Sequence, residues 1–200
     1  MANPWSLYQR QPAFVLGFHG SDKAIVDRVV SQKDRHLKKS EGLFEWLGHG
    51  VYFWENDPQR AFEWAQTGNA KNPIKTPDSV GAVIDLGFCL DLTTRIGLEE
   101  VKEAFETLRD IYAKSGLALP KNHLGRDKVI RELDCQVIQA LHAYRTESGK
   151  PAYDSVRAPF PEDNLLFDDS GFRLRNHVQI CVIKPELCIK GYFRAIQSQS

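Results

Sequence analysis

The sequence predicts a single α+β domain, and three observations carry this prediction. The chain has 200 residues, 42% of them hydrophobic, which is enough for one substantial core, and no Pro-rich or Ser-rich linker divides it. Apolar runs typical of strands occur near both ends, whereas the middle of the chain has two amphipathic helical patterns. Because neither end can bury its apolar run alone, we expect strands from both ends to meet.

The N-terminal half predicts alternating short strands and helices. Residues 13–18 indicate a buried strand, after which Ser21 or Asp22 caps a helix with one apolar face. A polar surface loop over residues 31–45 leads to a short aromatic strand over residues 51–54. A helix begins at the Asn56-Asp57-Pro58 turn and stops near Gly68, and we expect Glu55 to stabilise its N-terminus.

The second half predicts the remaining elements. Residues 80–92 suit one strand with a bend at Gly87. Apolar periodicity indicates helices over residues 98–115 and 127–144. The following stretch, residues 146–176, predicts a loop of a length that is usually functional or disordered, and its aromatic residues favour order. Two strands, residues 178–183 and 188–193, are joined by a turn over residues 184–186.

Composition argues against several classes of protein, namely general nucleic-acid binders, membrane proteins and proteins held by disulfides or zinc. The 26 basic and 26 acidic residues cancel, so no net charge draws the chain onto nucleic acid or an anionic membrane. No apolar stretch is long enough to cross a bilayer, and the N-terminus lacks a signal-peptide pattern, which predicts a soluble cytoplasmic protein. The four cysteines lie in apolar runs without a C-x-x-C pair or zinc-ligand spacing, so we expect reduced core thiols.

A ligand site is predicted around residues 46–58. Gly48 and Gly50 allow the backbone to approach a ligand, the strand that follows places Tyr52 on a wall, and a helix start lies close by. Two more residues stand out as companions of Tyr52, namely His19 at the end of the first strand and Gln179 in the penultimate strand. Each signal is weak alone, because such residues are commonly structural, but the three form a specific set.

These residues resemble motifs of the ADP-ribosyltransferase superfamily, in the diphtheria-toxin-like branch that includes the poly(ADP-ribose) polymerases. The matching segments are Phe18-His19-Gly20-Ser21, Gly48-His49-Gly50-Val51-Tyr52-Phe53 and Gln179-Ile180-Cys181-Val182. The third departs from the family pattern, because Gln179 stands where the family usually has Glu. The sequence around the motifs also resembles that of a group of uncharacterised bacterial proteins. The resemblance covers the core strands from Phe14 to the C-terminus and leaves the helices between residues 98 and 144 outside its motifs.

The resemblance implies an α+β fold with a split β-sheet core, flanking helices and an NAD site between two small sheets. In the family, the backbone of Gly20 would bind the nicotinamide carboxamide, and His19 would bind the adenosine ribose with Ser21 close by. Tyr52 would stack on the nicotinamide ring, which Phe62, or alternatively Trp64, would sandwich from the other side.

Two further residues have expected roles, Gln179 through the resemblance and Arg157 through its guanidinium group. Gln179 would hold the ribose 2′-OH but supply less electrostatic stabilisation than Glu. Arg157 would either pair with the NAD diphosphate or make a structural ion pair. The loop before Gln179 offers bases for an acceptor, namely Glu162, Asp163, Asp168 and Asp169. In the approach to Gln179, Arg173, Arg175 and His177 alternate, which favours a solvated face over an acceptor-binding patch.

The implied function is an NAD-dependent mono-ADP-ribosyltransferase, of the kind found among bacterial toxins and defence effectors. NAD is then a substrate, and the acceptor is left open between protein, nucleic acid and small molecule. An antitoxin or immunity protein as a neutralising partner is left open as well. Two alternatives remain at this point: an NAD glycohydrolase, in which water is the acceptor, and a non-catalytic module that binds NAD or ADP-ribose.

Overall fold

The chain forms an α+β structure around one seven-stranded mixed sheet. The computed structural model describes residues 14–42, 45–67, 73–123 and 130–195. The strand order is β4-β7-β8-β2-β1-β3-β9, and β5 and β6 form a separate two-stranded sheet. The elements in the described residues are β1 (Phe14–Asp22), α1 (Lys23–Val30), β2 (Val51–Glu55), α2 (Pro58–Thr67), β3 (Pro77–Asp85), β4 (Cys89–Asp91), α3 (Arg95–Ser115), β5 (Asn122–His123), β6 (Ile130–Arg131), α4 (Glu132–Glu147), β7 (Ser155–Phe160), β8 (His177–Val182), α5 (Pro185–Cys188) and β9 (Ile189–Arg194).

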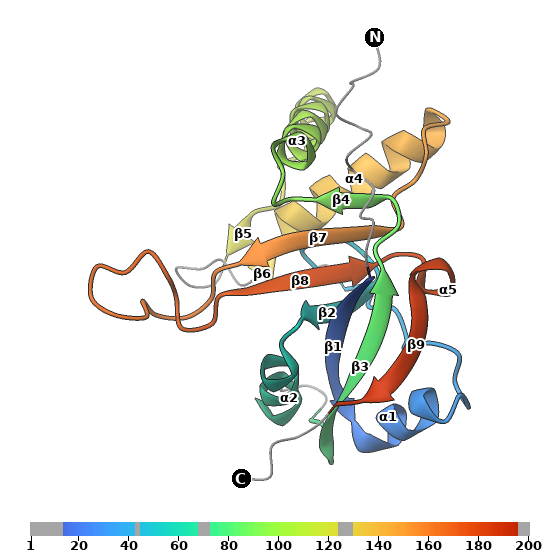
Figure 1. Cartoon of the computed structure of the whole chain (residues 1–200). Helices are drawn as coiled ribbons and strands as arrows, with labels where there is room; N and C mark the ends of the chain where they lie inside the picture. The colour runs from blue at the N-terminus through green and yellow to red at the C-terminus, as the bar shows by residue number, and fades with distance from the viewer. Residues whose placement is uncertain (1–13, 43–44, 68–72, 124–129, 196–200) are drawn as a thin grey trace.

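The sheet changes direction in its middle. In Figure 1, β4, β7 and β8 run roughly horizontally, whereas β1, β3 and β9 run roughly vertically. β2 lies between these two groups in the strand order. The β1–β3 ladder pairs the whole of β1, but the β1–β2 ladder has only two pairs, Gly17 with Glu55 and Phe18 with Trp54. β1 and β2 therefore diverge beyond Phe18 and Trp54, and their divergence creates an opening in the sheet.

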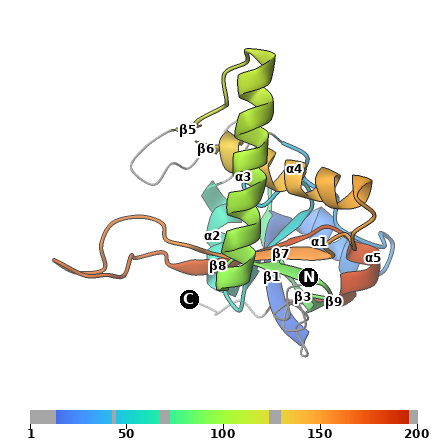
Figure 2. The same ribbon diagram turned by 90° about the horizontal axis from the view of Figure 1, so that it is seen from above.

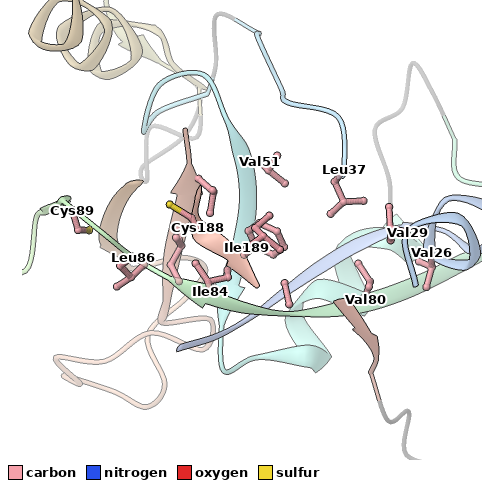
Figure 3. Close-up of a cluster of buried hydrophobic side chains, with 14 residues drawn as sticks. Val26, Val29, Leu37, Val51, Val80, Ile84, Leu86, Cys89, Cys188 and Ile189 are labelled. Atoms are coloured by element: carbon pink, nitrogen blue, oxygen red, sulfur yellow. The ribbon is translucent and has the colours of Figure 1, made fainter. Parts of the chain in front are cut away.

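The helices bury the faces of the two halves. Figure 3 shows the core on one face, where Val26 and Val29 of α1 lie close to Val80 of β3, and Ile84 lies farther along β3, close to Ile189. α2 covers the opposite face, because Ala61 packs with Phe18 and Trp54. Figures 1 and 2 place α3 and α4 on the β4 side of the sheet, away from α1. A second core, which includes Ile138 of α4, lies there.

Local signals explain several boundaries. Asp22 caps α1 by accepting a hydrogen bond from the N–H of Ala24, as the sequence predicts. α3 begins after the Thr94 cap and ends at Gly116, whose φ of 66° suits a left-handed C-cap. All four cysteines are buried free thiols, which confirms the prediction. No helix in the described ranges has the length and apolar character to cross a bilayer.

Two expectations about strands are wrong. Residues 80–92 form two strands in different halves of the sheet, because Gly87 takes a φ of 59° and Phe88 then donates its N–H to the Asp154 carboxylate at 2.9 Å. The stretch 146–176 contains β7, which was not predicted because Arg157 and Pro159 interrupt its apolar pattern. Pro159 fits there because the β4–β7 ladder ends at Arg157, so its missing N–H costs no hydrogen bond of that ladder.

The last two strands do not form a hairpin. β8 lies between β2 and β7, whereas β9 pairs with β3 at the far edge, and α5 connects them. Strands from both ends of the chain thus share one sheet, with β3 between β1 and β9. The predicted helix start at Asp127 and the predicted stop at Gly68 lie outside the described residues.

Candidate functional site

A cavity of about 280 Å³ lies at the divergence of β1 and β2, and we name it the β1–β2 cavity. It brings together His19, Tyr52 and Gln179, which come from three strands and are remote in the sequence. Its other lining residues are Lys38, Ser40, Glu45, Trp46, Gly50, Phe53, Trp54, Arg60, Trp64, Phe160 and Glu162. The three residues that the sequence singled out therefore share one concave surface.

His19 bridges the two diverging strands. Its Nδ1 lies 2.7 Å from the carbonyl oxygen of Tyr52, and because a carbonyl only accepts, Nδ1 carries the proton. Burial lowers the pKa of His19, partly offset by this hydrogen bond, so the ring is neutral near pH 7. Nε2 of the neutral ring is then a hydrogen-bond acceptor.

Gly20 combines an open backbone with a tightly packed Cα. The N–H of Asn56 donates to the carbonyl of Leu16 at 2.9 Å, so the alternation of β1 turns the Gly20 N–H and C=O toward β2 as well. The β1–β2 ladder ends at Phe18, so these groups face the opening. A Cβ on Gly20 would lie 2.0 Å from the Ala61 carbonyl oxygen, so the packing of α2 alone requires glycine here.

Tyr52 ties its ring to the preceding loop. Its hydroxyl accepts a hydrogen bond from the N–H of Leu47 at 2.9 Å and donates one to the carbonyl of Gly48 at 2.8 Å. Burial raises the pKa of Tyr52 well above its ordinary value, so the hydroxyl stays protonated. The hydroxyl therefore fixes the loop, while the ring lines the cavity.

Gln179 has both ends of its amide engaged. Trp46 Nε1 donates to Gln179 Oε1 at 2.8 Å, and Gln179 Nε2 lies 3.0 Å from His177 Nε2. His177 Nδ1 donates to the Arg175 carbonyl at 2.9 Å, so Nε2 of the neutral ring accepts from Gln179. This position requires one acceptor and one donor, which an amide supplies and a carboxylate does not.

Replacing Gln179 by Glu is expected to change how stability depends on pH. In the wild type, burial lowers the pKa of His177, so its protonation favours unfolding as the pH falls below about 6.5. The variant places a carboxylate oxygen against Nε2, which raises the pKa of His177 and stabilises the charged ring. That contribution is present at low pH and is lost as the pH rises through the raised pKa.

Urea unfolding at pH 5.5 and pH 8 measures this effect. We expect Gln179→Glu to lose more stability relative to wild type at pH 8 than at pH 5.5. A difference between the two proteins that is the same at both pH values would contradict the assigned hydrogen-bond directions.

Six Trp, Tyr and Phe residues contribute aromatic rings to the cavity wall. The Trp46 and Phe160 centroids are 5.0 Å apart, and Trp64 lies 6.0 Å from Trp54 and 6.5 Å from His19. The Arg131 guanidinium covers Trp46 at 4.7 Å and fixes that side of the wall. A concave site with aromatic side chains in its wall suits a planar heteroaromatic ring.

Two carboxylates, Glu45 and Glu162, line the cavity, and two cations, Lys38 and Arg60, accompany them. Arg60 Nη2 contacts both Glu162 oxygens, at 2.8 and 3.0 Å. Of the four acidic loop residues that the sequence offered as bases, Glu162 is the one in the described cavity lining.

The other acidic residues of that loop are elsewhere. Asp163 pairs with Arg175 at 3.5 Å, and Asp168 and Asp169 are exposed near the tip of the loop, which projects from β7 and β8 in Figure 1. The predicted solvated face is wrong for His177, which is 8% exposed because its ring stacks on Phe160.

Four predicted residues lie outside the described cavity lining, and the first of them is Gly20, whose backbone faces the gap between β1 and β2. Ser21 is buried next to α1, and Phe62 is half-buried on α2, whereas the alternative residue Trp64 does line the cavity. Arg157 makes the structural ion pair that the sequence left open, with Glu55 at 2.6 Å and Asp91 at 3.3 Å. Glu55 therefore does not cap α2, and Asp57 does so by accepting from the N–H of Arg60 at 2.9 Å.

Several lining residues were not predicted from the sequence. Trp46 belongs to residues 46–58, around which a ligand site was predicted. Its contact with Gln179 spans 133 positions, however, and no local sequence pattern indicates this contact. Glu45 and Arg60 are charged residues in ordinary polar surroundings of the sequence. Their places in the cavity wall are set by the tertiary fold.

A larger cavity, of about 670 Å³, lies between α3 and α4 and contains none of the predicted site residues. The described residues include no group of three His, Cys, Asp or Glu side chains that could hold a metal ion. Compared with known proteins, the chain matches no protein-family model, no curated protein and no solved structure.

Proposed function

We propose that this protein is an NAD-dependent mono-ADP-ribosyltransferase and that the β1–β2 cavity is its NAD site. The observation that carries the proposal is the convergence of His19, Tyr52 and Gln179 on one cavity. The divergence of β1 and β2 supports the split-sheet core that the sequence resemblance implies. The aromatic walls supply the surface that a nicotinamide ring needs.

Each residue has a role that suits its position. The outward backbone of Gly20 pairs with the nicotinamide carboxamide, and Tyr52 and Trp64 flank the ring. Nε2 of His19 accepts a hydrogen bond from a ribose hydroxyl of NAD. The cavity, at about 280 Å³, is slightly smaller than ordinary ligand sites, which span about 300–1,000 Å³, so we assign to it only the nicotinamide ribose half of NAD.

The reaction breaks the bond between the ribose C1′ and the nicotinamide nitrogen. Both electrons leave with neutral nicotinamide, and the ribose passes through an oxocarbenium-like state that an acceptor attacks. Gln179 can hold a ribose hydroxyl with its remaining amide hydrogen or lone pair, but it carries no charge. We therefore propose a slow transfer of single ADP-ribose units.

One observation favours a second candidate, a non-catalytic module that binds NAD or ADP-ribose. Trp46 and His177 hold both ends of the Gln179 amide, so the side chain is already satisfied without a ligand. In that case the cavity binds the dinucleotide and the bond to nicotinamide stays intact.

Two radiolabelled forms of NAD separate these functions. The purified protein is incubated with a cell lysate and NAD labelled either in the nicotinamide or in the adenine. Adenine label on a macromolecule together with free nicotinamide supports the transferase, whereas free nicotinamide without labelled macromolecules supports a glycohydrolase. Calorimetric binding of NAD without release supports the module, and absence of both binding and release contradicts the assignment of the site.

A further inference from the structure

Glu45 lies in the wall of the β1–β2 cavity beside the residue that contacts Gln179. It precedes Trp46, whose indole N–H donates to Gln179 Oε1 at 2.8 Å. Its backbone is fixed at both ends, because its N–H donates to the Gly42 carbonyl at 3.3 Å and its carbonyl accepts from the N–H of Gly48 at 2.7 Å. One short segment therefore carries both a carboxylate and the Gln179 contact.

The two carboxylates of the cavity differ in their electrostatic state. Glu162 is compensated by Arg60, whose guanidinium makes contacts with both of its oxygens. Glu45 accepts a hydrogen bond from the Ser40 hydroxyl and has no ion pair among those that the described residues form, and Lys38, which also lines the cavity, makes none with it. Glu45 is thus, among the described residues, the cavity carboxylate without a direct ion pair.

The position of this charge is held by the fold. Ser40 forms a bridge with Gly50, in which the Ser40 N–H donates to the Gly50 carbonyl at 2.8 Å and the reverse bond measures 3.1 Å. The carboxylate also reaches the residues around Gly50 electrostatically. Burial is the main cause of the raised pKa of the Cys181 thiol, and the Glu45 charge adds to it.

We propose that Glu45 is the catalytic carboxylate of this site and replaces the charge that Gln179 lacks. This inference rests on the proposed function. As the C1′–N bond breaks and its electron pair leaves with nicotinamide, positive charge develops on the ribose, and Glu45 stabilises it electrostatically. The acceptor, or water, then bonds to C1′ and releases its proton to solvent. Gln179 positions a ribose hydroxyl, and the two residues divide the work of one glutamate.

Glu45→Gln tests the inference directly. This variant keeps the Ser40 hydrogen bond through the amide oxygen and removes the charge. We expect kcat for nicotinamide release to fall about 100-fold, in the range found when one stabilising group of an active site is removed, with the Kd for NAD changed less than about 3-fold. Glu41→Gln, at an exposed position four residues earlier, is the matched control and should retain wild-type kcat.

A second arm distinguishes catalysis from a structural role. If Glu45 supplies charge, the double variant Glu45→Gln with Gln179→Glu should release nicotinamide about 10-fold faster than Glu45→Gln alone. A structural role predicts no such rescue. If circular dichroism shows that Glu45→Gln does not fold, Glu45→Asp replaces it in the test. This variant keeps the charge on a side chain that is one methylene shorter, and it should give an intermediate kcat.

The outcomes separate this inference from the proposed function. Nicotinamide release by the wild type together with full kcat in Glu45→Gln overturns the role of Glu45 and leaves the transferase intact. An active wild type with loss in Glu45→Gln and no rescue by Gln179→Glu also overturns it. A wild type that binds NAD and releases no nicotinamide overturns the proposed function and this role together.

Discussion

Replacing Tyr52 by Ala is expected to reduce nicotinamide release at least about 100-fold, because a wall of the reacting half of the site disappears. The change also removes a mostly buried aromatic ring, which should lower the free energy of unfolding by about 3 kcal/mol. Release is measured by chromatography and stability by urea unfolding, so that activity is expressed per folded molecule. Wild-type release from folded Tyr52→Ala would contradict the assigned site.

Tyr52→Phe is the matched control. It keeps the ring and deletes the hydroxyl that bonds the Leu47 N–H and the Gly48 carbonyl. We expect nicotinamide release within about 10-fold of wild type and a loss of about 1–2 kcal/mol in the free energy of unfolding. A loss of activity as large as that of Tyr52→Ala would assign the function to the hydroxyl and its loop instead of to the ring.

Replacing Arg157 by Met is expected to produce the largest loss of stability, about 3–5 kcal/mol in the free energy of unfolding. The Arg157 guanidinium bonds both Glu55 oxygens, at 2.6 and 3.1 Å, and reaches Asp91 at 3.3 Å. The side chains of Glu55 and Asp91 are only 13% and 6% exposed, so removal of the cation leaves two poorly solvated negative charges. Urea unfolding measures the loss.

Arg95→Met provides the comparison for this ion pair. Arg95 pairs with Glu99 on the surface of α3, where its side chain is 91% exposed, so its loss should scarcely change stability. Calorimetry on the folded fraction of Arg157→Met should give a Kd for NAD close to that of wild type. A tenfold weaker Kd with unchanged stability would restore Arg157 to a diphosphate-binding role.

The sequence predicted those parts of the fold that rest on local patterns. Apolar runs indicated β1, β2 and β8, periodicity indicated α1, α3 and α4, and the motif around Tyr52 led to the residues that meet in the cavity. β7 was not predicted, because Arg157 and Pro159 interrupt its apolar character. Arg157 is explained by its ion pairs with Glu55 and Asp91, and Pro159 by the end of the β4–β7 ladder at Arg157.

The detail of the site could not be predicted for the same reason. Glutamine at position 179 is explained by a donor from Trp46 and an acceptor on His177, and the first of these lies 133 positions away. Gly20 belongs to a ligand-binding motif by resemblance, yet the Ala61 carbonyl already excludes any side chain there. Contacts between distant segments decide both positions.

The indole N–H resonances of Trp46, Trp54 and Trp64 offer the most direct test of the central claim, because all three side chains line the β1–β2 cavity. NAD is titrated into nitrogen-15-labelled protein, and these resonances are compared with the backbone amides of Leu108 and Tyr144 in the α3–α4 cavity. We predict saturable shifts of the three indoles and unchanged amides in the α3–α4 cavity. Shifts confined to Leu108 and Tyr144, or no shifts at millimolar NAD, would contradict the account.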